Sequence, residues 1–436
     1  MEKLLAMARK VCDQAEVYSV EYVADMVSYQ NAKLDKIDTN FLSGYSLRII
    51  KDGRLGFAYT RNLRDRQEFL QNALDSLKGG VRAEYVFPFA KKLPSIRTYD
   101  PSIKNLSGES IVAEAGRVSD ILKSQTDGEI ASGSFTYREK IKIINTKGAD
   151  LSARSSYAGV YGGIIFPDSG SRISRFYQGK RFRRMPQGLL DELIMLYKHG
   201  VKIAEPKAGR MKVLFMPDSL ITLLWRMQSG TSSKNVYEKV SPISKKIGRK
   251  IFSERLTIVD DPLDDRYPGA RAFDDEGVAC KPLTLVKNGV LKSFYYDLKY
   301  AKKLKAKSTG HGYRSGPWGG DPISLRPDPA LAHLFIRPGK RSFMELVKSM
   351  DRGIILEGVL GPHSGNIPNG DYSVGASPGF YVEDGEIAGR VKDVMVAGNI
   401  YQTLKNVIDL GDALYPAFGG WAPAVLCDDV SVATKK

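Results

Sequence analysis

The clearest fold signal in the chain is the stretch YSLRIIKDGRLGFAY, residues 45–59. Apolar residues alternate with other residues on both sides of Asp52-Gly53, and this period of two is typical of half-buried strands. The Asp-Gly pair supplies the positive φ that a tight hairpin turn needs. Asn288-Gly289 separates two similar runs later in the chain. The sequence therefore predicts antiparallel hairpins in both halves.

Helices and further strands are predicted outward from the first hairpin. The spacing of apolar residues predicts an amphipathic helix within residues 1–16 and further helices over 69–77, 111–122 and 189–204. Strand patterns occupy roughly 130–166. Strands and helices occur in clusters and not in strict alternation, so an α+β fold is favoured over a doubly wound parallel sheet.

The length of 436 residues predicts two or three folding units. A change of composition precedes the middle of the chain, where six cations occur over 172–187 with no acidic residue: Arg172, Arg175, Lys180, Arg181, Arg183 and Arg184. A loop with Pro206 and Gly209 follows. We therefore expect an N-terminal α+β domain over residues 1–205 and a strand-rich C-terminal domain over 206–436, with mixed sheets and flanking helices.

The chain is basic, with 65 Lys and Arg against 49 Asp and Glu, a formal charge of +16. Such a charge favours anionic partners without identifying one. The three cysteines, Cys12, Cys280 and Cys427, are far apart, which argues against a disulfide framework and favours a reducing compartment. No run approaches the ~20 apolar residues of a membrane span. We expect a cytoplasmic protein that does not associate with membranes.

Histidine spacing gives no metal motif. The four histidines never lie three to five residues apart, so neither HExxH nor HExxxH occurs. His311 and His363 lie in glycine-rich loops, where backbone can approach a bound chain. The stretch 375–379 matches GxSxG, but Pro378 has no N–H to offer an oxyanion hole, so a turn is the better interpretation.

Three consecutive acids, Asp274, Asp275 and Glu276, stand beside Gly277. Two interpretations remain open. The carboxylates can share a proton or hold a cation, or the aspartates can accept hydrogen bonds from nearby backbone amides in a loop, which is the more frequent arrangement.

Several segments together resemble the TldD/PmbA family, and within it the TldE (PmbA) branch. They are DGRLGFAYT at 52–60, NTKG at 145–148 with SSYA at 155–158, FDDEG at 273–277, NGVLK at 288–292, STG at 308–310, HSGN at 363–366 with GDYS at 370–373, and AGN at 397–399. Each segment is short, but their joint order is specific and spans most of the chain.

The resemblance implies a subunit of an intracellular zinc-dependent peptidase built from TldD-type and TldE-type chains. In that family the TldD-type chain carries an HExxxH helix and a C-terminal cysteine that complete the zinc site. Overlaying this pattern places Leu224 and Ser229 at the two histidine positions, Trp225 at the glutamate position and Asp409 near the cysteine position. We therefore expect no catalytic residue, no metal site and no cofactor in this chain, with zinc held by a TldD-like partner.

The expected role of this chain is to complete the fold and the peptide channel of that partner. The complex would act on unfolded or leader peptides, and this chain alone would not hydrolyse them. An extended peptide can add to strand edges through its backbone. The candidate peptide-binding residues are His311, His363, Asn366, Asp274, Asp275 and Glu276. A homodimer is left open.

Two other functions stay as alternatives. One is DNA binding or association with gyrase, suggested by the charge of +16 and by the family's older name as a modulator of DNA gyrase, although a nucleic acid is the less favoured partner. The other is a self-sufficient metallopeptidase with a non-standard site made from His311, His363 and the acidic triplet.

Overall fold

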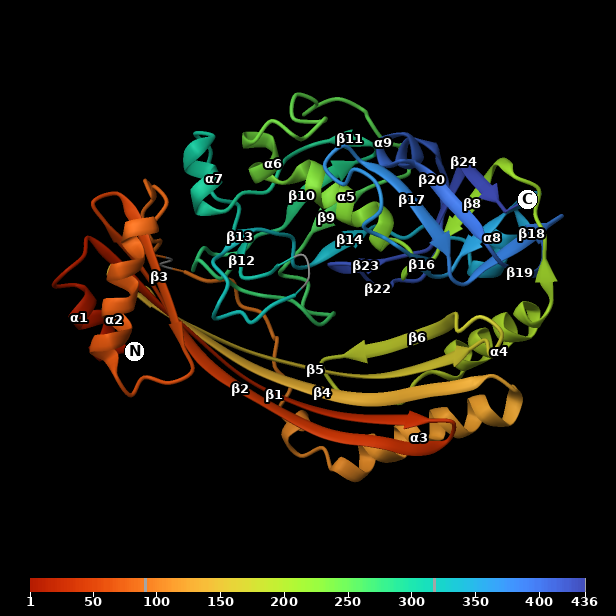
Figure 1. Cartoon of the computed structure of the whole chain (residues 1–436), viewed down its shortest axis with the longest axis horizontal. Coiled ribbons are helices and arrows are strands. Elements are labelled where there is room, and N and C mark those ends of the chain that lie inside the picture. Colours follow the sequence, from red (N-terminus) through yellow and green to blue (C-terminus); the bar gives the residue numbers. More distant parts are fainter. Residues whose placement is uncertain (90–91, 317–318, 436) are drawn as a thin grey trace.

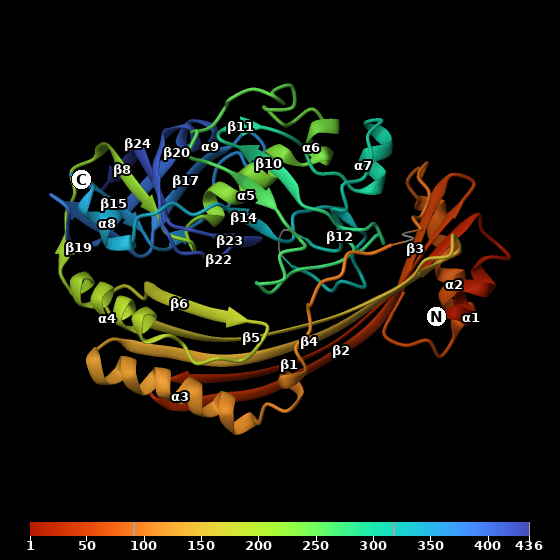
Figure 2. The same cartoon turned by 180° about the vertical axis from the view of Figure 1, so that it is seen from behind.

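The structure, a computed structural model, describes residues 1–89, 92–316 and 319–435. The first half is built on one antiparallel sheet with the strand order β3-β2-β1-β4-β5-β6. Its strands are β1 (Gln14–Gln30), β2 (Lys33–Lys51), β3 (Arg54–Thr60), β4 (Glu129–Asn145), β5 (Asp150–Ile165) and β6 (Arg172–Gly179). The sheet is long and curved, and its concave side faces the second half of the chain (Figures 1 and 2).

The two predicted hairpin turns are confirmed. Asp52 and Gly53 adopt φ values of 50° and 68°, and Asn288 and Gly289 adopt 48° and 75°. These left-handed conformations are the ones that a two-residue hairpin turn demands, and Asn, Asp and Gly adopt them at the smallest steric cost.

Helices cover the outer side and the two ends of the first sheet (Figure 1). They are α1 (Glu2–Ala8), α2 (Arg66–Asp75), α3 (Gly108–Gln125) and α4 (Gln187–Val201), with short 3-10 turns η1 (Ser76–Gly79) and η2 (Pro101–Lys104). The helix predicted within residues 1–16 is shorter than expected. Residues from Gln14 onward join β1, because pairing with β2 and β4 on both sides outweighs a helical pattern of apolar residues.

The close approach of α3 to the sheet depends on a glycine in β5. A Cβ at Gly162 would lie 2.8 Å from the Val118 side chain and 3.2 Å from that of Leu122. Both residues are fully buried in the core between α3 and the sheet. Glycine is therefore the residue that lets this helix pack without a shift.

The second half contains two larger sheets. The first, ten-stranded, has the order β16-β17-β20-β24-β8-β15-β18-β19-β7, with β21 paired to β24. Its members are β7 (Ile203–Ala204), β8 (Gly209–Phe215), β15 (Arg352–Leu356), β16 (Val359–Leu360), β17 (Asp371–Ala376), β18 (Gly379–Glu383), β19 (Glu386–Val391), β20 (Val394–Asn399), β21 (Val407–Leu410) and β24 (Val425–Thr434). The parallel pairs β8–β15 and β7–β19 make this sheet mixed, whereas the N-terminal sheet is antiparallel.

The second of these sheets has the order β11-β10-β9-β14-β23-β22. Its strands are β9 (Ile258–Asp260), β10 (Leu283–Lys287), β11 (Val290–Leu291), β14 (Leu334–Ile336), β22 (Tyr415–Ala417) and β23 (Gly420–Ala422), and a separate pair consists of β12 (Gly312–Tyr313) and β13 (Asp328–Pro329). Short helices complete this half: α5 (Ile221–Thr231), α6 (Ser233–Tyr237), α7 (Leu298–Lys303), α8 (Phe343–Lys348), α9 (Ile400–Thr403) and η3 (Leu404–Asn406).

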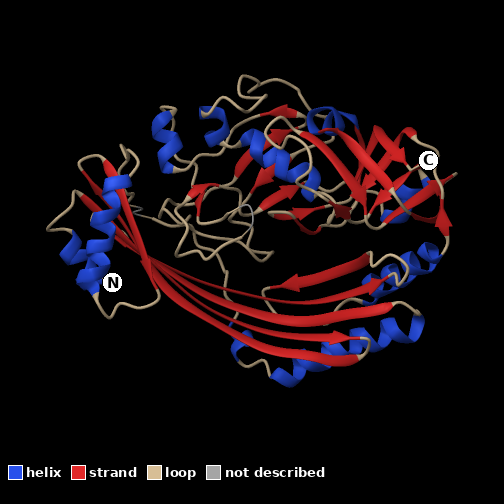
Figure 3. Ribbon diagram, in the orientation of Figure 1, coloured by secondary structure: helices blue, strands red, loops and turns tan. Residues whose placement is uncertain are grey.

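This architecture confirms the predicted α+β class, with strands dominant in both halves (Figure 3). The chain leaves the first sheet after β6 and enters the ten-stranded sheet at β7, just before the predicted boundary at 205. That boundary stays a prediction. Within the described ranges, no helix is long and apolar enough to cross a membrane.

Candidate functional site

Helix α5 occupies the position where the family resemblance places a zinc motif in TldD-type chains. Leu224 is 2% exposed and Met227 is fully buried, and both belong to the core that joins α5 to the two C-terminal sheets. Trp225 packs against the ring of Phe418, with 6.1 Å between ring centroids, and the Ser229 hydroxyl accepts a hydrogen bond from Asn235. The three overlay positions therefore carry packing groups.

These residues do not fit a catalytic zinc. Zinc takes thiolate, imidazole or carboxylate ligands, and a catalytic site adds a polarised water. A leucine side chain has no donor atom, an indole N–H is a hydrogen-bond donor without a free lone pair, and Ser229 already accepts from Asn235. No step of catalysis is assigned to zinc at this helix.

Arg226, in the middle of α5, is a residue that the sequence analysis missed. Its side chain is fully buried and is surrounded by backbone carbonyl groups. The guanidinium donates hydrogen bonds of 2.7–2.8 Å to the carbonyl oxygens of Thr222, Pro362, Ser364 and Asp371. Burial lowers the pKa of this guanidinium. Arg226 thus ties the loop that carries His363 to the start of β17.

The predicted cysteine position, Asp409, forms an ion pair with Arg341 at 3.1 Å. Strand pairing places Cys427 of β24 opposite Val407, two residues from Asp409. The Cys427 side chain is fully buried in the apolar core, and burial raises the pKa of its thiol. A protonated thiol in an apolar core is a packing group, since metal ligation needs the thiolate.

The acidic triplet is an internal structural element. Asp274, Asp275 and Glu276 are at most 4% exposed. Asp274 accepts hydrogen bonds from the backbone N–H groups of Glu276, Val278 and Gly312 at 2.8–3.0 Å. The Asp275 carboxylate accepts one from the backbone of Arg314 at 2.8 Å. This loop pattern is the second of the two interpretations that the sequence left open.

Glu276 also links the two halves of the chain. Its Oε1 lies 3.2 Å from Nη1 of Arg48 in β2, and Arg48 donates two further hydrogen bonds, at 2.7 and 2.9 Å, to Glu16 in β1. The guanidinium of Arg314 stacks over Tyr18 at 4.2 Å. We call Glu16, Arg48, Glu276 and Arg314 the buried junction, because each is at most 5% exposed.

His311 lies beside this region and is fully buried. Its Nε2 is 3.1 Å from Oδ2 of Asp260, and its Nδ1 is 2.9 Å from the Thr309 hydroxyl. His311, Asp274 and Glu276 are closed off from a peptide in this conformation, whereas Asp275 borders a cavity. The assignment of His311 and the acidic triplet to a peptide site stays a prediction. The contacts that these residues make in the structure hold loops together.

His363 and Asn366 lie elsewhere, on the exposed loop before β17. The Asn366 side-chain oxygen accepts a hydrogen bond from the backbone N–H of Asn369 at 3.1 Å, so this side chain stabilises the turn. Because His363 belongs to the Arg226-bound loop while His311 lies near the buried junction, the predicted residues divide between two regions and do not form one centre.

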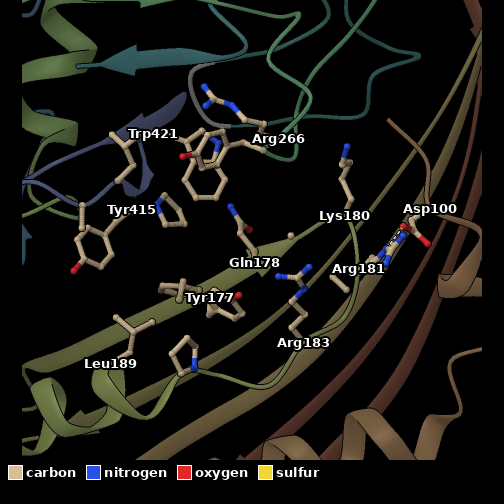
Figure 4. A pocket seen from close by; sticks show the side chains of 18 of the residues that line it. Asp100, Tyr177, Gln178, Lys180, Arg181, Arg183, Leu189, Arg266, Tyr415 and Trp421 are labelled. Atoms are coloured by element: carbon tan, nitrogen blue, oxygen red, sulfur yellow. Dashed lines mark hydrogen bonds and ion pairs between the residues drawn. The ribbon is translucent and has the colours of Figure 1, made fainter. Parts of the chain in front are cut away.

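A cleft of about 920 Å³ lies between the two halves. One wall comes from β6, the loop after it and the segment 97–101. The opposite wall consists of Arg266 and Tyr267 with residues 413–416 and Trp421 (Figure 4). The sequence analysis did not find this cleft, because its walls come from four distant segments, although the basic run at 172–187 pointed to one of them.

Two edge strands border the cleft. β6 is the last strand of the N-terminal sheet, and β22 is the last strand of the six-stranded C-terminal sheet. An edge strand offers a row of backbone N–H and C=O groups to another extended chain. On β22, Pro416 removes one such N–H. β6 is therefore the better of the two edges for pairing.

The cleft continues towards the buried junction. A second cavity of about 670 Å³ shares Arg97, Tyr99, Lys180 and Tyr267 with the first and is also lined by Asp275 and Arg314. The two cavities are therefore neighbours, and together they extend along the N-terminal sheet. An extended peptide fits this shape better than a compact small molecule does.

The charges of the cleft are mostly positive. Five cations line it, Arg97, Lys180, Arg181, Arg183 and Arg266, against two acids, Asp100 and Glu192. Arg181 pairs with Asp100. Hydrogen bonds from Ser102, and then the contact with Arg181, lower the pKa of Asp100 to about 2. Glu192 pairs with the buried Arg175 of β6.

Comparisons with known proteins agree on one family. The model of the PmbA/TldA metallopeptidase C-terminal domain matches residues 208–434, and that of PmbA/TldA metallopeptidase domain 1 matches residues 15–80. An uncharacterised protein of Methanocaldococcus jannaschii is 28% identical, over 94% of this chain and 95% of its own length. The metalloprotease PmbA of Escherichia coli O157:H7 is 23% identical, over 98% of this chain and 94% of its own.

Solved structures share the whole fold. A Thermotoga maritima protein described as a modulator of a DNA gyrase matches with a TM-score of 0.87 and 26% identity, over 99% of both chains. TldE from Thermococcus kodakarensis matches with a TM-score of 0.90 and 23% identity, also over 99% of both chains. These likenesses extend over both halves of the molecule.

Proposed function

The chain belongs to the TldD/PmbA family of metallopeptidases, as its motifs predicted, and from this premise we propose that it is a PmbA-type (TldE-type) cytoplasmic subunit. In this role it binds unfolded or leader peptides and presents them to a TldD-like partner that holds the catalytic zinc. The relatives named PmbA, similar over nearly the whole chain, support the branch.

The observation that carries the proposal is the composition of α5. Where a zinc-binding relative is expected to hold two histidines and a glutamate, this chain has Leu224, Trp225 and Ser229, and Leu224 is part of the core. Zinc in the partner would polarise water and the scissile carbonyl. This chain contributes binding surface, and its own side chains move no proton in the reaction.

Peptide capture in the cleft rests on shape and on backbone groups. The edge of β6 runs along one wall, and backbone pairing with an extended substrate supplies affinity without demanding one sequence. This property suits a peptidase for unfolded chains. Aromatic residues on both walls, Tyr177 and Trp421 among them, offer apolar contacts to substrate side chains (Figure 4).

The first experiment compares the full-length chain alone with the chain mixed with a TldD-type protein that carries HExxxH. We expect zinc and cleavage of an unfolded peptide in the mixture, and neither in the lone chain. Stoichiometric zinc together with full cleavage by the lone chain would refute the proposal. Metal analysis and mass spectrometry of the products provide the two readouts.

A second experiment locates the peptide. A peptide with a photoreactive side chain is expected to crosslink to residues 176–183 or 413–416 of the cleft in the full-length chain. Peptide mapping of the adducts gives the answer. Adducts confined to the loop at 361–370 would place the binding site at His363 and Asn366 instead.

Binding of DNA is the second candidate function. It is favoured by the formal charge of +16 and by the Thermotoga maritima structure that is described as a modulator of a DNA gyrase. Such binding would weaken steeply as salt is added, because phosphate contacts release counterions. Retention on duplex DNA at physiological salt, with a preferred sequence, would favour this function over peptide capture.

A further inference from the structure

The cleft holds positive charge that the protein itself does not neutralise. Lys180 lies 3.6 Å from Asp265, and Arg266 forms an ion pair with Asp264. Arg181 is paired with Asp100. By contrast, Arg97 and Arg183 have exposed side chains and form no ion pair with any residue that the structure describes. Both lie on the N-terminal wall.

Arg183 is placed so that its unpaired positive charge can contact a ligand in the cleft. Its guanidinium points into the space of the cleft, towards Gln178 and the opposite wall (Figure 4). It follows β6 by four residues, so it lies close to the edge where a peptide backbone would pair. Another cation of the same run, Arg175, is buried and committed to Glu192 and Glu357. The basic run is thus divided between a structural cation and ligand-facing ones.

We propose that the cleft selects peptides with acidic side chains, and that Arg183 and Arg97 are the residues that determine this specificity. The inference rests on the proposed function, since it assigns a substrate class to the same cleft. A carboxylate spaced along an extended peptide meets an unpaired guanidinium, and Arg is the cation best suited to a carboxylate because its planar group binds both oxygens.

The charge pattern favours a peptide over a nucleic acid. Once the ion pairs among the described residues are counted, two cations that line the cleft remain without a partner, and the acids Asp100 and Glu192 are already paired with Arg181 and Arg175. A nucleic acid carries one negative charge per nucleotide, which is more charge than two guanidinium groups can match along the cleft. A peptide can carry two carboxylates and neutral residues between them, which matches the surface.

The experiment measures binding of labelled, unstructured peptides of about ten residues to the full-length chain by fluorescence anisotropy. Three peptides share one neutral sequence and differ at two positions, which hold Glu, Gln or Lys. We expect the Glu peptide to bind about fivefold or more tightly than the Gln peptide at low salt, and the Lys peptide to bind most weakly. The difference shrinks as salt approaches about 0.3 M.

Two charge-matched variants test the residue assignment. Arg183→Gln is expected to weaken binding of the Glu peptide about threefold to tenfold, and to weaken binding of the Gln peptide by a clearly smaller factor. Arg64→Gln removes the same charge from an exposed residue between β3 and α2 that does not line the cleft, and it is expected to change neither. An equal loss in both variants would show a general charge effect and overturn the inference.

The outcomes separate the inference from the function on which it rests. Equal affinity for the Glu and Gln peptides overturns the acidic preference and leaves peptide capture standing. A failure of all three peptides to bind removes the proposed function as well. If a single-stranded DNA of matched charge binds as tightly as the Glu peptide and depends on Arg183 to the same degree, the cleft is a general polyanion site and the inference is wrong.

Discussion

The two halves of the chain meet at the buried junction and along the cleft, and charged side chains are arranged differently in the two places. At the junction, Arg48 lies between Glu16 and Glu276, all at most 1% exposed. In the cleft, Arg97 and Arg183 face solvent and form no ion pair within the described ranges. Burial makes an unpaired charge very costly, whereas water screens an exposed one. The comparison shows where a charge serves the fold and where it is available for a ligand.

The largest effect is expected from Arg48→Met, which leaves Glu16 and Glu276 buried without a cation between them. We expect the free energy of unfolding to fall by about 4 kcal/mol, measured by urea denaturation at neutral pH. The triple variant Glu16→Gln, Arg48→Met, Glu276→Gln removes the two carboxylate charges that Arg48 had balanced, although it leaves Arg314, 4.0 Å from Glu16, with its charge, and it should recover part of this loss. A single variant as stable as the parent would contradict the role of the junction.

Arg226→Met is expected to have the next largest effect. Among the described residues this arginine has no carboxylate partner in an ion pair, and its guanidinium donates to four carbonyl groups. Its loss leaves buried carbonyls unpaired, for an expected destabilisation of about 3 kcal/mol. Thermal unfolding gives the measurement, and Arg61→Met, at an exposed arginine, is the matched control with a change within about 0.5 kcal/mol. Equal stability of both variants would show that the hydrogen bonds of Arg226 to the four carbonyl groups do not stabilise the fold.

A smaller effect is expected at Asp297, the N-cap of α7, beside the junction. Burial and then the charge of Glu276 raise the pKa of this carboxyl to about 8. The folded state therefore holds a proton that the unfolded state releases near pH 4. The contribution of this carboxyl group to the free energy of unfolding is complete below pH 4 and is lost as pH rises towards about 8. In this range the free energy of unfolding falls by at most about 1.4 kcal/mol per pH unit because of this group.

Asp297→Asn tests this titration, because an amide oxygen can still accept the hydrogen bond from the backbone N–H of Tyr300. We expect the variant to gain stability relative to the parent as pH rises from about 5 to 8. Urea denaturation at several pH values measures the difference. Parallel pH profiles for the two proteins would show that Asp297 does not titrate in this range.

The smallest effect on stability is expected from Arg183→Gln in the cleft. With no ion pair to lose within the described residues, its free energy of unfolding should stay within about 0.5 kcal/mol of the parent value. The same denaturation measurement serves here. A loss comparable to that of Arg48→Met would mean that the cleft cation is structural, and the contrast between the two regions would disappear.

Local features were predictable because short-range backbone geometry decides them. The turns at Asp52-Gly53 and Asn288-Gly289 need residues that tolerate positive φ. The capping box of Ser342 and Glu345 at the start of α8 is a feature of the same local kind, since both of its hydrogen bonds are made within four residues. The first helix was overestimated, because strand pairing with distant segments decides the structure from Gln14 onward.

The candidate site was harder to predict, for a different physical reason. Arg226 looked like one of many charged residues, and its four carbonyl partners lie up to 145 positions away. The sequence left two interpretations of the acidic triplet open, because its contacts with Gly312, Arg314 and Arg48 join segments that lie far apart in the chain. The cleft lies between two sheet edges, and periodicity within one segment says nothing about which edges will face each other.

By itself, the order of residues determined the turns, the four helices of the first half, the family and the absence of ligand residues at 224, 225 and 229. Each depends on chemical identity or on contacts over a few positions. Tertiary structure alone decided which charges are buried in pairs and which remain exposed in the cleft. That division depends on solvent access, which arises when the curved sheet closes against the second half (Figures 1 and 2).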